Sequence, residues 1–204
     1  GWPVQLFSLV PFRRSNSVLA REGINAALDA KGEGDSPEAH FEETITAGDF
    51  LANQELPRQM CFAAPGIISL FERMGVMFNR AKHSLTARAG QNTGQQLLYA
   101  LDEQVRRFET EELVEKFEGW EFLSIVKDGR DICRGVVAMH LASMEVKAFP
   151  ADAVIVACEG PAPVFGPSIH ASGTGSAASS LYQQGVWYAN GEFIKREPMA
   201  RPGA

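Results

Sequence analysis

The stretch that decides the fold is Asp152-Ala153-Val154-Ile155-Val156-Ala157-Cys158-Glu159-Gly160-Pro161. A single Asp is followed by five uncharged residues, most of them small or β-branched, and the run then ends in Glu-Gly-Pro. This pattern is typical of a strand buried on both faces of a parallel sheet, with a turn at its carboxyl end. Ligands of open α/β sheets bind at that carboxyl edge. The stretch therefore predicts an α/β fold with a buried strand at Asp152–Ala157 and a ligand site beside it.

Length and composition limit the classes of protein that this chain can belong to. A chain of 204 residues, 45% hydrophobic and 22% charged, fits one globular domain, or at most two, with a sizeable core. The net charge of −6 argues against a nucleic-acid partner. The three cysteines are far apart and predict a reducing compartment, the cytoplasm, rather than a disulfide framework. No apolar run reaches the roughly 18 residues that a membrane span needs, so no direct membrane insertion is expected.

Around the deciding stretch, the periodicity of apolar residues predicts further strands and a helix. Alternation over residues 120–150 predicts a β-meander of three antiparallel strands, and Asp128-Gly129 joins the first two. After the stretch, a helix is expected from about Ser176 to Gly185, followed by a short strand around Trp187–Ile194. The three strands of the meander are predicted at Glu121–Lys127, Ile132–Leu141 and Met144–Phe149.

The first half of the chain is predicted to be mainly helical. A strand at Val4–Val10 precedes a helix that Ser36 caps, with Pro37 at its first position. Pro65-Gly66 interrupts the next helical region and predicts a kink or two short helices. Arg80–Asn92 is interpreted as a polar connector. The helix that begins at Thr93-Gly94 carries an apolar stripe, which predicts a core face: Leu97, Leu98, Leu101, Val105 and Phe108.

Several collinear stretches, which together cover almost the whole chain, resemble the flavoprotein subunits of succinate dehydrogenase and fumarate reductase. The longest begins Thr93-Gly94-Gln95-Gln96-Leu97-Leu98-Tyr99 and continues to Arg107. The others include Leu6–Pro11, Arg14–Val18, Lys31–Pro37, Gly48–Gln54, Arg73–Arg80, Glu118–Leu123, Thr174–Ser179 and Tyr188–Ile194. The resemblance implies a truncated, Rossmann-like FAD-binding domain. Residues 1–204 would form a single FAD-binding-domain-like unit with the meander at 120–150, lacking the family's first βα unit, capping domain and helical domain.

The resemblance also implies FAD as the cofactor and suggests which residues bind it. Ser8 would meet the adenosine ribose, although a Ser after a strand is equally common in an ordinary turn. Ser15 and Ser17 would donate to the pyrophosphate. Asn16 takes the position of the family's flavin-linked histidine and has no nucleophilic ring nitrogen, so FAD would be bound noncovalently. The implied cofactor-binding residues are Ser8, Arg14, Ser15, Asn16, Ser17, Ala20, Gly23, Ala157, Gly160, Thr174, Gly175 and Ser176.

Three glutamates depart from the family's pattern at positions that would lie near the ligands. Glu22 and Glu159 each replace a glycine of a cofactor loop, where backbone must approach the ligand closely. Glu197 replaces the histidine that holds the dicarboxylate substrate, and its negative charge would repel that substrate. The family's proton-donating arginine lies beyond residue 204. We therefore expect no catalytic residue in this chain. The histidine spacing indicates no metal site.

Two functions remain open on the sequence alone. The first is an FAD-binding domain of a flavoprotein whose family interconverts succinate and fumarate by hydride transfer to flavin N5. The resemblance then implies an iron–sulfur subunit and membrane-anchor subunits as partners, and a cytoplasmic location associated with the membrane through them. The second is a flavin-free pseudoenzyme or structural scaffold subunit, or an engineered fragment, that needs a complementing chain because the sheet would otherwise contain a gap with unpaired strand edges.

Overall fold

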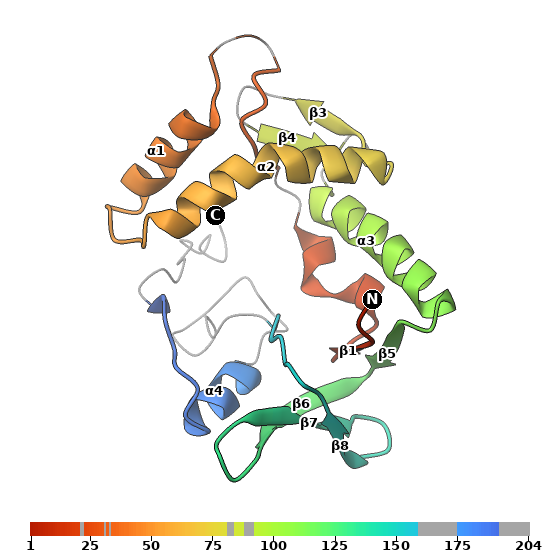
Figure 1. Cartoon of the computed structure of the whole chain (residues 1–204). Helices are drawn as coiled ribbons and strands as arrows, with labels where there is room; N and C mark the ends of the chain where they lie inside the picture. The colour runs from red at the N-terminus through yellow and green to blue at the C-terminus, as the bar shows by residue number, and fades with distance from the viewer. Residues whose placement is uncertain are drawn as a thin grey trace, which may run out of the picture. The chain divides into compact units, whose positions relative to one another are not determined.

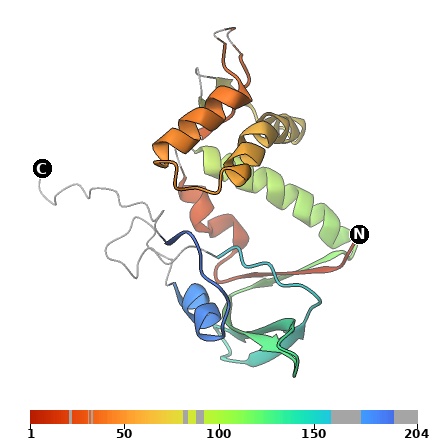
Figure 2. The same cartoon turned by 60° about the vertical axis from the view of Figure 1, so that its left-hand side comes forward.

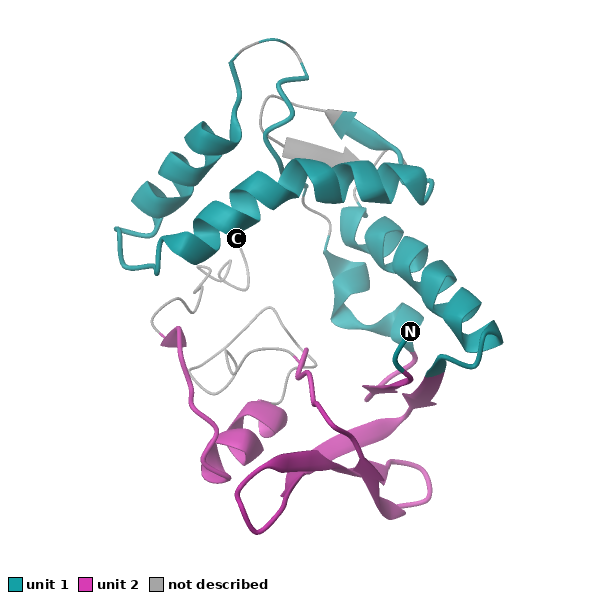
Figure 3. Cartoon of the chain, in the orientation of Figure 1, with its two compact units in different colours: residues 1–2, 12–114 teal, residues 3–11, 115–204 magenta. Residues whose placement is uncertain are grey.

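The structure, a computed structural model, describes residues 1–20, 23–30, 32, 34–80, 84–87, 92–158 and 175–191. The chain divides into two compact units, which Figure 3 shows in different colours. The first unit comprises Gly1–Trp2 and Phe12–Val114, and the second comprises Pro3–Pro11 and Glu115–Ala204. Both units combine helices with strands, so the predicted α/β class is confirmed.

Two helices of the first unit, α1 (Pro37–Ala47) and α2 (Glu55–Arg73), pack against each other (Figures 1 and 2). The predicted start of α1 is confirmed, because Ser36 Oγ accepts a hydrogen bond from the Ala39 N–H at 3.1 Å. Of the two alternatives predicted at Pro65-Gly66, the two short helices are wrong, since α2 runs through Pro65 as one helix, whereas the kink stays a prediction. Proline removes one helical hydrogen bond, but packing of the flanking turns retains the helix.

The core of the first unit lies between α2 and a small sheet. Two residues form the buried centre of this core: Ala26, which is 4% exposed, and Ile68 of α2, which is 2% exposed. Four further apolar side chains pack against this pair: Ile24, Leu28, Ala64 and Phe78. Burial of such side chains is the main source of stability of the unit.

The sheet of the first unit contains three short antiparallel strands in the order β2-β4-β3. They are β2 (Ile24–Asn25), β3 (Phe78–Arg80) and β4 (Ser84–Ala87). The interpretation of residues 80–92 as a polar connector is therefore wrong in part. Strand β4 alternates polar and apolar residues over only four positions, Ser84 to Ala87, and its pairing with β2 and β3 is what identifies it as a strand.

The first unit also contains two short 3-10 helices and a long α-helix. The short ones are η1 (Phe12–Arg14) and η2 (Asn16–Leu19). Helix α3 (Thr93–Thr110) confirms the helix expected from Thr93. Its apolar stripe is only partly a core face, because Leu101 and Phe108 are 43% and 42% exposed.

The second unit is built on the predicted meander. Strands β6 (Trp120–Lys127), β7 (Cys133–His140) and β8 (Val146–Pro150) pair antiparallel in that order, which confirms the prediction. The first hairpin turns at Asp128, whose Oδ1 accepts hydrogen bonds from the N–H groups of Arg130 and Ile132 at 2.8 and 3.1 Å.

A two-stranded sheet joins the beginning of the chain to its middle. Strand β1 (Val4–Ser8), which the sequence predicts, pairs with β5 (Val114–Glu118). The rings of Phe7 and Phe117 stack at 4.7 Å between centroids, and Phe149 meets both edge-on. Trp120 packs edge-on against Phe117 and Phe149. This aromatic cluster ties β1 and β5 to the meander.

The buried strand predicted at Asp152–Ala157 is absent from the structure. These residues form no strand, Ile155 is 92% exposed, and Val156 is 43% exposed. A strand of this kind obtains its burial from neighbouring strands on both sides, and among the described residues none pairs with residues 152–157. The apolar pattern is present, but the pairing that would make it a strand is not.

Helix α4 (Ser176–Gln183) confirms the helix predicted near the end of the chain. The strand expected around Trp187–Ile194 is wrong over its described part, because residues 187–190 lie in no strand and Trp187 is 97% exposed. Residues from 192 onward lie outside the described part of the chain. Among the described residues, no helix is both long and apolar enough to cross a membrane.

Candidate functional site

Most of the predicted cofactor-binding residues of the first unit lie in one short segment, from η1 to Ala20. Ser15 separates η1 from η2 and is the N-cap of η2. Its backbone is extended (φ −65°, ψ 161°), and its side chain makes no capping hydrogen bond. The Ser15 hydroxyl therefore has no role in starting η2.

This segment presents polar groups to solvent. Arg14, Ser17 and Ala20 are exposed, whereas Asn16 and Gly23 are partly buried. One guanidinium and one hydroxyl are thus accessible on neighbouring turns. Both are donors of the kind that bind phosphate oxygens.

Helix α3 packs closely against this segment through a glycine. The Gly94 N–H donates a hydrogen bond to the Ala20 carbonyl at 2.9 Å. A Cβ added at Gly94 would lie 2.1 Å from the Ser17 carbonyl oxygen and 2.7 Å from the Ala20 Cβ. Only a residue without a side chain allows this approach. Gly94 therefore determines how closely the start of α3 contacts η2.

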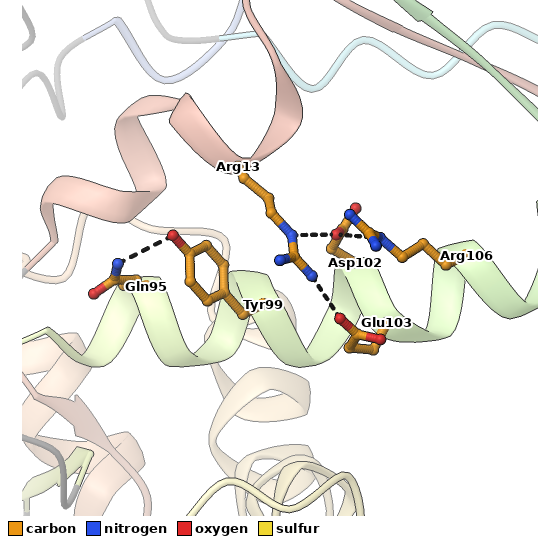
Figure 4. A network of polar contacts seen from close by, with 6 residues as sticks. All are labelled: Arg13, Gln95, Tyr99, Asp102, Glu103 and Arg106. Carbon is orange, nitrogen blue, oxygen red and sulfur yellow. Dashed lines mark hydrogen bonds and ion pairs between the residues drawn. The ribbon is translucent and has the colours of Figure 1, made fainter.

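A second contact joins η1 to the middle of α3 through a buried carboxylate, as Figure 4 shows. Asp102 Oδ2 accepts hydrogen bonds from Arg13 Nε at 2.6 Å and from Arg106 Nε at 3.0 Å. The Asp102 side chain is only 5% exposed. A terminal guanidinium nitrogen of Arg13 also donates to Glu103 Oε1 at 2.5 Å. Two carboxylates of α3 thus hold the Arg13 guanidinium in place.

The aromatic ring of Tyr99 completes the surroundings of Arg13. The Arg13 guanidinium carbon lies 4.9 Å from the Tyr99 ring centroid, and the Tyr99 hydroxyl accepts a hydrogen bond from Gln95 Nε2 at 3.1 Å. The hydrogen bond to Asp102 is the main cause that raises the pKa of Arg13 above its ordinary value. Arg13 therefore stays charged and connects η1 to α3. Its neighbour Arg14 is exposed to solvent.

Three residues that hold this segment in place, Gly94, Asp102 and Arg13, were not predicted from the sequence. One signal was available for Asp102, because it is a carboxylate four residues before Arg106 and directly after Leu101 of the apolar stripe. A charged residue beside an apolar stripe indicates a buried partner, but the sequence does not say which residue that partner is.

Four predicted cofactor residues lie in the described part of the second unit. Ser8 ends β1 and is partly buried, and Ala157 is exposed. Gly175 is the buried N-cap of α4 with a positive φ of 69°, and Ser176, the first residue of α4, is exposed. A side chain is strained at this positive φ, so the backbone at the start of α4 favours glycine at position 175. An α-helix start carries partial positive charge.

The remaining predicted residues, Gly160 and Thr174, lie outside the described residues. So do the three glutamates that depart from the family's pattern, Glu22, Glu159 and Glu197. Among the residues that the structure describes, no group of three or more His, Cys, Asp or Glu side chains is arranged to hold a metal ion. The described chain therefore holds two separate candidate binding elements, each within its own unit. One is the Arg14–Ser17 segment, in which Arg14 and Ser17 are exposed, and the other is the start of α4.

Comparison with known proteins identifies relatives along the whole chain. Residues 1–181 match the family described as "FAD binding domain". The chain is 55% identical over 217 aligned positions to the succinate dehydrogenase flavoprotein subunit of Bacillus subtilis, covering 100% of this chain and 37% of that protein. It is 27% identical over 213 positions to the fumarate reductase flavoprotein subunit of Mycobacterium tuberculosis, covering 98% of this chain and 35% of that protein. The chain thus spans little more than a third of the length of each.

The same likeness is found among solved structures. A Mycobacterium smegmatis Sdh1 structure in complex with UQ1 matches with a TM-score of 0.80 at 21% identity, covering 89% of this chain and 34% of that one. At this identity the match supports the fold alone. The sequence match over residues 1–181 and the 55% identity carry the assignment. The chain belongs to the FAD-binding domain family, as a portion of the kind found in succinate dehydrogenase and fumarate reductase flavoprotein subunits.

Proposed function

We propose that this chain binds FAD noncovalently, as part of a flavoprotein of the succinate dehydrogenase and fumarate reductase type. The observation that carries the proposal is the segment from η1 to Ala20. It exposes Arg14 and Ser17, while the Gly94 contact and the Asp102 network hold it against α3. A segment that is fixed before the ligand arrives loses little entropy on binding.

The residue types present in the described chain fit the chemistry of FAD. Arg14 and the hydroxyls of Ser15 and Ser17 are suited to the two phosphates. The start of α4 at Gly175 and Ser176 offers backbone N–H donors and partial positive charge. Asn16 can hydrogen-bond, but its amide is not a nucleophile that could form a bond to the flavin. When bound, FAD supplies the hydride-accepting ring that no amino acid side chain provides.

In this proposal the redox reaction, the interconversion of succinate and fumarate, belongs to a larger assembly. The chain binds and orients the cofactor, and other parts of the protein hold the dicarboxylate. The relatives are named as flavoprotein subunits. We therefore include an iron–sulfur subunit and membrane-anchor subunits as partners, with a cytoplasmic location beside the membrane. The finer fold assignment, a Rossmann-like unit extending over residues 1–204, is part of the same proposal.

The test is whether the purified chain takes up FAD and how it releases it. The protein is incubated with FAD, freed of excess cofactor by gel filtration, and examined for flavin absorbance. Acid denaturation should release all flavin into the supernatant, because no covalent bond holds it. Flavin that stays with the precipitate would contradict noncovalent binding, and protein that remains colourless would contradict FAD binding altogether.

Substitution of Arg14 gives the proposal a residue-level test. Arg14→Ala should weaken FAD binding about tenfold, because a charge-assisted hydrogen bond to phosphate is lost. Arg130→Ala is the matched control, since Arg130 is also an exposed arginine but lies in the β6–β7 turn. If the two substitutions weaken FAD binding equally, Arg14 acts only through the net charge of the chain and not through a specific contact with the cofactor.

The two glutamates at family glycine positions provide a second variant. The double substitution Glu22→Gly with Glu159→Gly removes two negative charges and two side chains from the proposed cofactor loops. FAD affinity should rise if those carboxylates oppose the cofactor. An unchanged affinity would mean that they lie away from it.

A flavin-free scaffold is the second candidate function, and one observation favours it. The apolar residues Val154–Val156 are unpaired by any described strand, and Ile155 is almost fully exposed. Exposed, extended apolar segments are sites where another polypeptide can add a strand. In this alternative the chain pairs with a complementing chain there and never binds FAD. The colourless outcome of the uptake experiment, together with a stable complex with that chain, would support it.

A further inference from the structure

Helix α4 covers one edge of the meander in the second unit. Among the strands that the structure describes, β6 has a paired neighbour, β7, on one side only, since the order of the sheet is β6-β7-β8. Its other edge, which would otherwise present unpaired N–H and C=O groups, contacts α4 (Figure 1). Side chains of α4 and of its C-cap residue bond to the backbone of this edge.

Gln184, the C-cap residue of α4, bonds to both backbone groups of one β6 residue. Its Oε1 accepts a hydrogen bond from the Ile125 N–H at 2.9 Å, and its Nε2 donates to the Ile125 carbonyl at 3.0 Å. A neighbouring strand would engage the same two groups through its own peptide. The carboxamide of Gln184 therefore replaces one residue of a strand.

Ser180, one helical turn before Gln184, makes a parallel contact. Its Oγ donates to the Leu123 carbonyl at 2.5 Å. The register of β6 against β7 shifts between Phe122 and Ser124, so Leu123 lies in a bulge. In addition, Lys127 Nζ donates to the Gln184 carbonyl at 2.8 Å. Three alternate residues of β6 thus form hydrogen bonds with the carboxyl half of α4 and its C-cap residue: Leu123, Ile125 and Lys127.

The spacings of the two elements match. Ser180 and Gln184 are four residues apart and so lie on one face of a helix, whereas Leu123 and Ile125 are two apart and point to the same edge of a strand. Two anchoring points along the helix oppose both sliding and rotation of α4 against β6. The neighbouring residues Ser179 and Gln183 have the same side chains but are exposed.

We infer that Ser180 and Gln184 are positioning residues, which fix α4 on β6 and thereby hold the helix start at Gly175–Ser176 where it binds the anionic part of the cofactor. This inference rests on the proposed FAD function. The two residues do not touch the ligand in this scheme, and they act only by setting the position of the helix start.

The experiment compares matched variants of the full 204-residue chain: Gln184→Ala and Ser180→Ala, with Gln183→Ala and Ser179→Ala as controls. Amide hydrogen exchange is measured at Ile125 and in the first turn of α4, and FAD affinity is measured by fluorescence titration. Gln184→Ala should speed exchange of the Ile125 amide about tenfold, because the N–H loses its acceptor. FAD affinity should fall about fivefold, the lower end of typical coupling between two sites. The control variants should match the unmodified chain in both measurements.

The outcomes separate the inference from the function on which it rests. Unchanged exchange at Ile125 would overturn the contact itself. Faster exchange with unchanged FAD affinity would overturn the positioning role while leaving the FAD proposal intact. If the unmodified chain does not bind FAD, the FAD proposal fails, and faster exchange in the first turn of α4 in Gln184→Ala still supports fixation of that helix.

A second variant guards against loss of folding in Gln184→Ala. Gln184→Glu keeps an acceptor for the Ile125 N–H but removes the donor to the Ile125 carbonyl. The Ile125 amide should remain protected in this variant, while FAD binding should weaken less than in Gln184→Ala. Loss of protection at Ile125 in Gln184→Glu would contradict the assignment of the carboxamide oxygen as its acceptor.

Discussion

Arg13 Nε lies 2.6 Å from Asp102 Oδ2, although the two residues are 89 positions apart in the sequence. The carboxylate is 5% exposed, whereas the side chains of its two arginine partners, Arg13 and Arg106, are 38% and 55% exposed. A buried carboxylate is costly unless it is paired, and here one oxygen receives both guanidinium groups. The pairing orients η1 against α3 and leaves Arg14, the next residue, facing solvent.

Asp102→Asn should loosen this contact. The amide keeps the size of the carboxylate but loses the charge that holds two guanidinium groups. We expect the midpoint of thermal unfolding to fall by roughly 5 °C and FAD binding to weaken in parallel. Glu103→Gln is the control, because Glu103 also bonds to Arg13 but its side chain is 62% exposed, and an exposed pair contributes little. Equal loss of stability in the two variants would contradict the central role of Asp102.

Gly94→Ala should separate α3 from η2. The new Cβ would lie 2.1 Å from a backbone oxygen of Ser17, which cannot move without shifting the segment. We expect a loss of about 1–3 kcal/mol in the free energy of unfolding, measured by urea denaturation, together with weaker FAD binding.

The matched control for Gly94 is Gly66→Ala in α2. A Cβ at Gly66 meets no atom within 4 Å, and alanine favours a helix interior. This variant should be as stable as the unmodified chain, or more stable by up to about 1 kcal/mol. A stable Gly94→Ala variant with unchanged FAD affinity would show that the close approach to Ser17 is not required.

The elements that the sequence predicted correctly are those decided by local chemistry. Ser36 and Pro37 specify a helix start within four residues, and the alternation over residues 120–150 specifies strands whose partners are next in sequence. In both cases the interacting groups are close along the chain. The sequence pattern therefore contains all the information that the element needs.

The features that the sequence did not predict depend on partners far away along the chain. Val154–Ile155–Val156 has the composition of a buried strand, but pairing decides whether it becomes one. Asp102 is buried because Arg13 reaches it, and Gln184 acquires its role from Ile125, 59 positions earlier. Of the candidate site, the segment around Arg14–Ser17 was predicted from the family resemblance, whereas the residues that hold it were found only in the structure.

Asp128 should make stability depend on pH in the acid range. The hydrogen bonds from the Arg130 and Ile132 N–H groups, followed by that from Arg134, hold the pKa of Asp128 below its ordinary value. The unfolded state thus takes up the proton more readily than the folded state. The stabilisation is fully present above the ordinary aspartate pKa and is lost as the pH falls below about 4 through the folded value.

Asp128→Asn should consequently be less stable than the unmodified chain at about pH 7, and the difference should shrink towards about pH 3. Urea denaturation at both pH values measures this. Asp131→Asn is the control, because Asp131 is a carboxylate of the same turn whose side chain is 79% exposed and pairs with Lys127. A difference for Asp128→Asn that stays constant with pH would mean that its effect is steric rather than electrostatic.

Ile155→Asp tests the main difference between the sequence pattern and the structure. Ile155 is 92% exposed, so a carboxylate there remains hydrated, and the free energy of unfolding should change by less than about 0.5 kcal/mol. Ile45→Asp is the contrast, because Ile45 is 4% exposed in α1 and burying an unpaired charge there should cost about 4 kcal/mol or more. If Ile155→Asp destabilises the chain as strongly as Ile45→Asp, then residues 152–157 are buried in solution, as the apolar pattern predicted. If stability is unchanged and self-association at high concentration decreases, the segment is an exposed surface that other polypeptides can contact.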